Sequence, residues 1–251
     1  MRIMISCGEP SGDLYAGALA AELRARVPSV DIVGLGGPRL RAAGAVLSDE
    51  FTGLTVNGLT EIVRVLPRSW QMYRRLVREA RTVRPDVFVP IDFSGFNFRL
   101  MAAVRRLGVA VVYYVSPQVW AWRPHRIDTM KRLVDKVLVI FPFDATLYER
   151  AGIPVQFVGH PLVDLARAEQ PRSAFLSGLG LNADAPTVAL LPGSRPNELR
   201  QIAATMSDAV AIICARVTGA QFVVARAPNL ADELFAPFRS DTAVVAGRTD
   251  D

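Results

Sequence analysis

The sequence of 251 residues predicts an α/β protein built on parallel sheets. Several apolar runs have the length of a strand, among them Val109–Val115 and Val137–Phe143, and their continuity is typical of strands buried on both faces of a parallel sheet. Helical patterns alternate with these runs, as in the stretch that carries Leu19, Leu23 and Val27 on one face. We therefore expect one complete α/β domain followed by the first part of another.

The expected elements follow the chain in a regular order. Strands are predicted at Ile3–Ser6, Asp31–Leu35, Val87–Val89, Val109–Val115, Lys136–Ile140, Val155–Val158, Val188–Leu191, Gln221–Ala225 and Ala243–Ala246. Helices are predicted after the first turn, over residues 59–84 with a break at Pro67, from about Phe98 to Leu107, before Lys136 and from about Asn197. Residues 170–184 mix proline, glycine and polar residues and are the expected linker, so the predicted domains are 1–169 and 185–251.

Composition limits the class of protein. Apolar residues make up 51% of the chain, yet no run approaches the roughly 18 residues that span a bilayer. The N-terminal segment MRIMISCGEP has too short an apolar part for a secretory signal. Cys7 and Cys214 lie far apart in apolar segments and imply no disulfide framework. These features indicate a cytoplasmic protein.

Basic residues are concentrated in one segment. Residues 64–84 contain seven arginines and one acidic residue, with Trp70 and Met72 among the charges. A basic amphipathic helix with aromatic residues can lie on an anionic membrane surface. A crossover helix with a solvated arginine face fits the same pattern equally well. No recognised nucleic-acid motif accompanies the arginines, and no nucleic-acid partner is expected.

Asp92 follows the buried run Val87–Val89 at the point where a central strand ends. Ligands of open α/β sheets bind in the crevice beyond the carboxyl ends of the strands, which places Asp92 in a candidate site. The alternative is that Asp92 caps the helix that we expect to begin near Phe98, after Gly95 and Asn97. Position alone does not separate these two interpretations.

Two turns contain several glycines, as phosphate-binding motifs do. The first, Gly8–Asp13, leads into a helix that Ser11 or Asp13 can cap, and it lacks the Gly-Lys-Ser/Thr of a P-loop. It either presents backbone N–H groups to an anion or only makes a tight connection. The second, Gly34–Arg39, has Pro38 within it and follows the second strand, so it is not a dinucleotide fingerprint. NAD is not expected.

The segment 116–126 combines two tryptophans with prolines and basic residues. Indole and guanidinium groups offer flat stacking surfaces and hydrogen-bond donors, and prolines restrict the loop, which favours a binding surface over a packing loop. His160 lies just after the strand Val155–Val158 and is either a ligand-binding residue or a packed turn residue.

Five stretches taken together resemble lipid-A-disaccharide synthase, an inverting glycosyltransferase family with the two-Rossmann GT-B architecture. They occur in family order and are Gly8–Asp13, Asp86–Asn97, Tyr114–Arg123, Phe157–Leu162 and Leu190–Arg195. The segment Thr55–Leu66 also resembles the family's apolar segment that approaches the membrane. This resemblance implies a complete N-terminal Rossmann-like domain and the first part of a second.

The resemblance implies the reaction and the residues that carry it. UDP-2,3-diacylglucosamine would be joined to 2,3-diacylglucosamine 1-phosphate (lipid X), releasing UDP, with Asp92 as general base. Neither a cofactor nor a metal is implied. The expected substrate-binding residues are Ser11, Asp13, Asn97, Ser116, Gln118, Trp120, Trp122, Arg123, Arg126 and His160, with Arg123 and Arg126 as candidates for the acceptor phosphate. The expected UDP-binding residues are Gly193, Ser194, Arg195 and Glu198.

Departures from the family pattern qualify this expectation. Ser94-Gly95 stands where the family often has Pro-Asp. The family's second domain continues past Asp251, so we expect a C-terminally truncated chain that is inactive as a transferase on its own. The full protein would be peripheral on the inner face of the inner membrane and could be a homodimer. The alternatives are a UDP-sugar 2-epimerase of the same architecture and a non-catalytic membrane-binding fragment.

Overall fold

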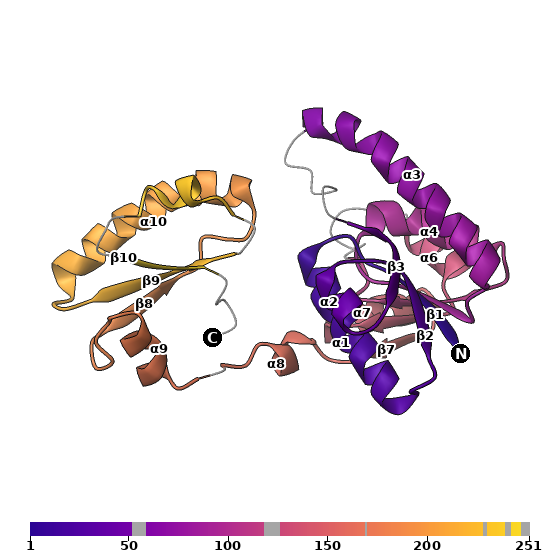
Figure 1. The fold of residues 1–251 in the computed structure, drawn as a ribbon, viewed down its shortest axis with the longest axis horizontal. Coiled ribbons are helices and arrows are strands. Elements are labelled where there is room, and N and C mark those ends of the chain that lie inside the picture. Colours follow the sequence, from indigo (N-terminus) through magenta and orange to yellow (C-terminus); the bar gives the residue numbers. More distant parts are fainter. Residues whose placement is uncertain (52–58, 118–125, 169, 228–229, 239–241, 247–251) are drawn as a thin grey trace. The chain divides into compact units, whose positions relative to one another are not determined.

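The computed structural model describes residues 1–51, 59–117, 126–168, 170–227, 230–238 and 242–246. These residues divide into two compact units, Met1–Pro161 and Leu162–Asp251 (Figure 1). The boundary between the units falls earlier in the sequence than the predicted start of the linker.

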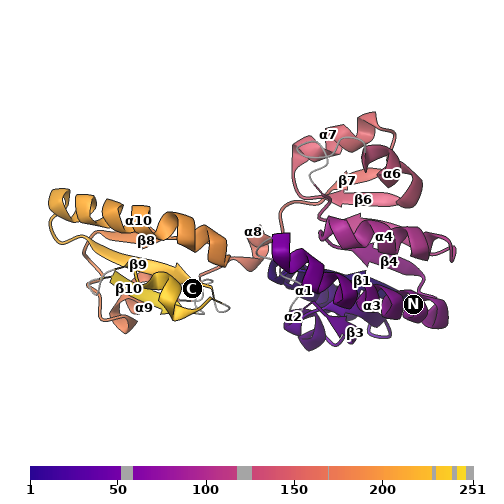
Figure 2. The same ribbon diagram turned by 90° about the horizontal axis from the view of Figure 1, so that it is seen from above.

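The first unit is built on a parallel sheet in the order β3-β2-β1-β4-β5-β6-β7 (Figure 2). Within the described residues its strands are β1 (Arg2–Ser6), β2 (Asp31–Gly36), β3 (Val46–Glu50), β4 (Val87–Pro90), β5 (Ala110–Tyr114), β6 (Lys136–Val139) and β7 (Val155–Phe157). The first six strands have the order of a Rossmann sheet, which confirms the predicted fold class. The strand order reverses between β1 and β4, which pair in register from Ile3 with Val87 to Ser6 with Pro90.

Helices cover both faces of this sheet. They are α1 (Pro10–Arg26), α2 (Pro38–Ala42), α3 (Leu59–Val83), α4 (Ser94–Arg105), α6 (Arg126–Leu133) and α7 (Pro142–Arg150). Buried side chains of α3, α4, α6 and α7 share one core with the sheet, including Met72, Leu100 and Tyr148. Helices α1 and α2 pack against each other on the opposite side of β1 and β2 (Figure 1). Side chains along β1 point alternately to the two faces of the sheet, and Met4 points to the face that α3 and α4 cover.

The second unit has a parallel sheet in the order β10-β9-β8. Its elements are α8 (Leu162–Leu165), α9 (Arg172–Gly178), β8 (Thr187–Leu190), α10 (Pro196–Arg216), β9 (Gln221–Arg226), the 3-10 helix η1 (Asp232–Phe235) and β10 (Thr242–Ala246). Leu199 and Ala203 of α10 pack with Phe222 and Val224 of β9. The predicted linker 170–184 contains α9 and stays a prediction as a domain boundary. Leu176 of that helix is buried with Val223.

Three further elements differ from the predictions. Helix α4 begins at Ser94 rather than near Phe98, so Asn97 lies inside the helix. Helix α3 runs through Pro67 instead of breaking there, because Met72, Leu76 and Ala80 beyond it are buried in the core. Strand β3 was not predicted, since its sequence VLSDE has no continuous apolar run and it lies at the edge of the sheet.

No helix in the described part of the chain is both long and apolar enough to cross a bilayer.

Glu79 of α3 allows a test of the packing between α3 and the sheet edge. Its Oε2 atom is buried with no hydrogen-bond partner, and burial raises the pKa of its carboxyl group above the ordinary 4.5, although a hydrogen bond with Ser48 opposes the shift. A raised folded-state pKa means that stability is lost as the pH rises from about 4.5 through that pKa. Glu79→Gln should therefore raise the melting temperature at pH 7–8 and leave it unchanged at pH 3.5.

The measurement is thermal unfolding followed by circular dichroism across this pH range. Glu149→Gln, at an exposed position on α7, is the matched control. A gain from Glu79→Gln that is equal at both pH values would contradict the assignment of the effect to the ionised carboxylate.

Candidate active site at the strand reversal

The candidate site lies at the carboxyl ends of β1 and β4, where the strand order of the first sheet reverses. Loops on the two sides of such a point diverge and leave a crevice that ligands occupy. Asp92 lies just after β4, and its side chain is exposed. It precedes Phe93, the N-cap residue of α4, so the structure does not support the alternative that Asp92 caps this helix.

The backbone at Asp92 has an unusual conformation. Asp92 and Phe93 are consecutive left-handed residues with φ values of 42° and 48°. Neighbouring Val115, after β5, has a φ of 53°, and its carbonyl oxygen accepts a hydrogen bond of 3.3 Å from the Asp92 N–H. A left-handed conformation costs a non-glycine residue on the order of 1–3 kcal/mol, and it persists only where surrounding contacts fix it. The Asp92 turn is therefore held by its neighbours.

Asn97 supplies most of the contacts that hold this turn. Its side chain is fully buried, and its amide nitrogen donates to the carbonyl oxygens of Asp92 at 2.8 Å, Ser6 at 3.3 Å and Ile91 at 3.4 Å. Its Oδ1 atom accepts a hydrogen bond of 2.7 Å from the Ser6 hydroxyl group. Both ends of the amide are thus engaged with the protein. Asn97 joins β1, β4 and α4, and its predicted contact with substrate stays a prediction.

Tyr113 is a second contact, and sequence reasoning did not single it out. Its hydroxyl group donates a hydrogen bond of 2.7 Å to the Asp92 carbonyl oxygen, and its side chain is fully buried. Burial, and then the charge of Asp92, raise the pKa of Tyr113 well above its ordinary value, so the phenol stays protonated and donates. The only signal for Tyr113 in the sequence was its polar hydroxyl group near the end of the apolar run Val109–Val115.

Asp13 has a different role from the predicted helix cap. Helix α1 begins at Pro10 with Glu9 as N-cap residue, so neither Ser11 nor Asp13 caps it. The buried Asp13 carboxylate instead accepts hydrogen bonds from the N–H groups at the start of α2, namely Gly37 at 2.7 Å, Arg39 at 2.9 Å and Leu40 at 3.1 Å. Both carboxylate oxygens are engaged, whereas Ser11 is exposed in the first turn of α1. Asp13 therefore fixes α2 against α1.

The first glycine turn is shaped by packing. A Cβ atom on Gly8 would lie 2.2 Å from the ring of Phe93, and one on Gly12 would lie 3.1 Å from Cβ of Cys7. Gly8 is needed because the Phe93 ring covers it. The turn after β1 and the turn after β4 therefore fit directly against each other at the strand reversal.

Arg126 is held beside the Asp92 turn. Its Nη1 atom donates a hydrogen bond of 3.3 Å to the Ser94 hydroxyl group, and its guanidinium lies 4.8 Å from the centre of the Phe98 ring. Ser94 and Phe98 both belong to α4, so the start of α6 is tied to α4 next to the candidate base. The predicted residues Gln118, Trp120, Trp122 and Arg123 lie outside the described residues.

Ser116 lies within hydrogen-bonding distance of Tyr148 on α7. Burial raises the pKa of Tyr148 to about 12, although a hydrogen bond with Ser116 opposes the shift. The Tyr148 hydroxyl group also donates to the Pro117 carbonyl oxygen at 3.3 Å. Tyr148 therefore anchors the beginning of the segment that carries the predicted binding residues.

His160 lies between aromatic residues of two distant elements. Its ring centroid is 6.1 Å from that of Tyr15 on α1 and 5.6 Å from that of Phe141 at the start of α7. Burial, and then the charge of Asp92, raise the pKa of Tyr15. The segment after β7 therefore crosses the strand ends toward α1, and it brings His160 to the same edge as Asp92.

The predicted UDP-binding residues form a separate arrangement in the second unit. The Glu198 carboxylate accepts hydrogen bonds from the N–H groups of Ser194 at 3.0 Å and Arg195 at 3.1 Å, and from the Arg195 guanidinium at 3.1 Å. Desolvation opposes ionisation, but these hydrogen bonds lower the pKa of Glu198. Gly193, with a φ of 106°, leaves room for Glu198, because a Cβ atom there would lie 2.4 Å from Oε2. The Glu198 carboxylate is thus the anion bound at the start of α10 in this structure.

Among the described residues, no three His, Cys, Asp or Glu side chains come together as a metal-ion site would require.

Similar solved structures define the fold class of this chain. A UDP-GlcNAc 2-epimerase from Neisseria meningitidis bound to UDP-GlcNAc matches 98% of this chain and 72% of its own, with a TM-score of 0.65 at 11% identity. The spinosyn rhamnosyltransferase SpnG, complexed with spinosyn aglycone, matches 98% and 71% with a TM-score of 0.53 at 15% identity. The chain thus has the GT-B fold that glycosyltransferases and these epimerases share.

Sequence comparison is more specific. The model of the lipid-A-disaccharide synthetase family matches residues 3–244, and the chain belongs to this family. A lipid-A-disaccharide synthase from Myxococcus xanthus is 43% identical over 229 residues, which cover 91% of this chain and 60% of the relative. One from Trichlorobacter lovleyi is 38% identical over 237 residues, which cover 94% and 62%. The chain therefore spans about 60% of the length of these relatives.

Removing the Asn97 amide tests its role at the strand reversal. Asn97→Ala leaves the buried Asp92 and Ser6 carbonyl groups without this donor, and it should lower the free energy of unfolding of the first unit by about 1–3 kcal/mol. Urea unfolding of the chain measures the change. Gln156→Ala, which removes an exposed amide hydrogen-bonded to Lys136, is the control and should cost less than about 0.5 kcal/mol. Equal losses for the two variants would show that the buried amide is dispensable.

Proposed function

We propose that this chain forms the acceptor-side unit and part of the donor-side unit of a lipid A disaccharide transferase. The reaction joins UDP-2,3-diacylglucosamine to 2,3-diacylglucosamine 1-phosphate with inversion and releases UDP. Family membership supports the reaction class. The observation that carries the assignment of roles is the exposed Asp92, whose backbone is held at the strand reversal by Asn97, Tyr113 and Val115.

Asp92 is the proposed general base. It takes the proton of the acceptor hydroxyl group while that oxygen forms a bond to the anomeric carbon of the donor, and the bond from that carbon to the UDP oxygen breaks. Attack from the face opposite UDP inverts the anomeric centre. A fixed carboxylate suits this step, because rate depends on holding the base within reach of the hydroxyl proton. The contacts to the Asp92 backbone provide that fixation.

Arg126 is the proposed partner of the acceptor phosphate, and Arg195 is the proposed partner of the UDP diphosphate. The Arg126 guanidinium is already oriented by Ser94 and the Phe98 ring, so little side-chain entropy is lost when it binds the acceptor phosphate. Arg195 lies at the start of the long helix α10, where its guanidinium now binds Glu198, and the UDP diphosphate would take the place of that carboxylate.

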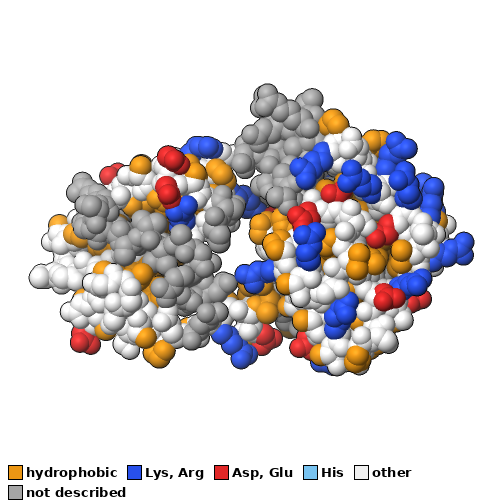
Figure 3. All heavy atoms as spheres, in the orientation of Figure 1, with side chains coloured by type: hydrophobic (Ala, Val, Ile, Leu, Met, Phe, Trp, Pro, Cys, Tyr) orange, Lys and Arg blue, Asp and Glu red, His pale blue; other side chains and the backbone are white. Residues whose placement is uncertain are grey.

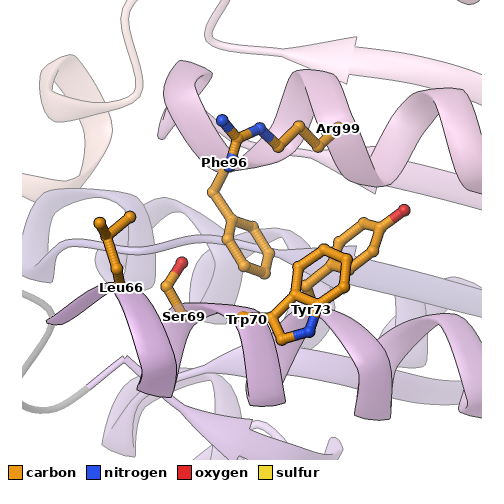
Figure 4. Close-up of a pocket in the computed structure, with 6 residues that line it drawn as sticks. All are labelled: Leu66, Ser69, Trp70, Tyr73, Phe96 and Arg99. Carbon is orange, nitrogen blue, oxygen red and sulfur yellow. The ribbon is translucent and has the colours of Figure 1, made fainter.

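The proposed location is the cytoplasmic surface of the inner membrane, reached through α3. Lysine and arginine side chains gather along the edge of the first unit where α3 lies (Figure 3). Leu66 and Trp70 of this helix are exposed, Trp70 by 57%, and Trp70 stacks on Tyr73 at 5.3 Å. They border a cavity of about 190 Å³ between α3 and α4, into which Phe96 points (Figure 4). Exposed apolar residues among arginines are typical of a helix at an anionic interface.

The main alternative is UDP-sugar 2-epimerisation. The epimerase structures share the fold at 10–13% identity, and likeness at that level carries no activity across. Incubation with UDP-GlcNAc alone distinguishes the two reactions. An epimerised product formed without any acceptor would overturn the transferase proposal.

Replacing the proposed base is the direct test of the mechanism. In a full-length version of the protein, Asp92→Asn should lower the rate of disaccharide formation by about 10²–10⁴, the usual contribution of a general base. UDP release in the presence of both lipid substrates measures the rate. Asp86→Asn, at the opposite end of β4, is the control and should keep the parental rate within a few-fold. A rate of Asp92→Asn close to that of the parent would place the base elsewhere.

Removing charge from α3 tests the membrane contact. Replacement of the exposed residues Arg68, Arg74 and Arg78 by Gln should weaken binding to anionic phospholipid vesicles by about 1 kcal/mol per charge. Co-sedimentation with vesicles at low and high salt measures it. The same number of substitutions in the second unit, at Arg167, Arg200 and Arg216, is the matched control. Equal weakening by both sets would assign the effect to net charge alone.

A further inference from the structure

The cavity between α3 and α4 has a connected set of aromatic rings along it (Figure 4). Trp70 stacks on Tyr73 with 5.3 Å between the ring centroids, and Tyr73 makes an edge-to-face contact with Phe96 at 6.5 Å. Trp70 is exposed, Tyr73 is half-buried, and Phe96 is buried in the core of the first unit. The rings therefore lead from the exposed surface of α3 to the buried core.

The size and the lining of this cavity suit a short stretch of hydrocarbon. Its lining residues are Leu66, Ser69, Trp70, Tyr73, Phe96 and Arg99, most of them apolar or aromatic. An apolar cavity of about 150 Å³ is large enough to bind benzene, so a cavity of about 190 Å³ accommodates a chain of roughly six to eight carbon atoms. A ligand with an alkyl chain is therefore favoured over a wholly polar one.

Phe93 joins this cavity to the Asp92 turn. Its ring stacks on that of Phe96, with 5.3 Å between the centroids and an angle of 24° between the planes. Phe93 directly follows Asp92 in the chain and is the N-cap residue of α4. The same ring covers Gly8, where a Cβ atom would lie 2.2 Å from it. Phe93 thus contacts both the buried end of the cavity and the turn after β1 at the strand reversal.

The polar residues of the cavity indicate the charge of its ligand. Arg99 is exposed and is the one charged residue among the described residues that line the cavity. Helix α3 adds the exposed residues Arg68, Arg74 and Arg78. This concentration of positive charge favours an anionic lipid over a neutral or cationic one. The Ser69 hydroxyl group and the Arg99 guanidinium are hydrogen-bond donors for the carbonyl oxygen of an acyl group.

We infer that this cavity is the subsite for one acyl chain of the acceptor and holds the part of that chain nearest the sugar. The chain enters past the Phe93 ring when the sugar lies at Asp92. The occupant is the acceptor rather than a membrane phospholipid, because Phe93 connects the cavity with the turn that carries the proposed base. This inference rests on the proposed function, because it takes the acylated sugar phosphate as the ligand.

A series of N-acyl glucosamine 1-phosphates, from acetyl to dodecanoyl, is the probe for this subsite. Isothermal titration of the purified chain, without donor or membrane and below the concentration at which each probe forms micelles, measures the affinities. The dissociation constant should fall about fourfold per added methylene group, which corresponds to about 0.8 kcal/mol. The fall should stop at roughly eight carbon atoms, because the cavity is then full. A flat apolar surface gives no such limit.

Substitutions in the lining test the location of the chain. Ser69→Phe fills the cavity and should abolish the gain in affinity with chain length. Trp70→Ala removes part of the wall at an exposed position and should reduce the gain to about twofold per methylene group. Arg99→Gln should weaken every probe about threefold without changing the gain per methylene group. Phe143→Ala on α7, which removes an aromatic side chain of nearly equal exposure to Trp70 (56% against 57%), is the matched control and should leave the series unchanged.

The outcomes separate this subsite from the proposed reaction. A gain that continues through the longest chain, or that is unaltered in both Ser69→Phe and Trp70→Ala, would overturn the acyl subsite and leave the transferase proposal intact. Tighter binding of a lysophosphatidylglycerol of matched chain length would assign the cavity to a membrane phospholipid, with the same consequence. A limit at roughly eight carbon atoms that depends on Ser69 and Trp70, together with no disaccharide from the full-length protein, would support the subsite and contradict the proposed reaction.

Discussion

The buried amide of Asn97 is the interaction on which the rest of the candidate site depends. It binds the carbonyl groups of Ser6, Ile91 and Asp92, so one side chain fixes the ends of the two central strands and the helix that follows. Without these hydrogen bonds the left-handed turn at Asp92 would relax, because its backbone conformation is unfavourable for non-glycine residues. The direction of the Asp92 carboxylate therefore follows from the packing of α4 on the sheet.

Asp13 and Asp92, two aspartates of the first unit, have different surroundings. Asp13 is buried against the backbone N–H groups of α2, whereas Asp92 is exposed beyond its strand. Two aspartates at the same edge of the sheet thus differ in burial, and the buried one has a structural role. The Asp13 carboxylate holds the start of α2 against α1, whereas the exposed Asp92 is the proposed base.

Secondary structure was largely predictable because it depends on local pattern. Continuous apolar runs located β1, β4, β5 and β6, and three strands of the second unit, within a few residues. The failures have physical causes. Strand β3 lies at an edge and needs no apolar run, and α3 continues through Pro67 because the residues beyond it are buried.

The sequence by itself determined the family, the α/β class and the position of Asp92 at a strand end, because these depend on motifs and on periodicity along the chain. Only the tertiary structure decided which residues hold Asp92 and which lie beside it. Ser6 precedes Asn97 by 91 positions, and His160 meets Tyr15 from the other end of the unit. Hydrogen bonds and ring contacts between segments so far apart leave no local pattern, since they arise only when the sheet brings its strand ends together.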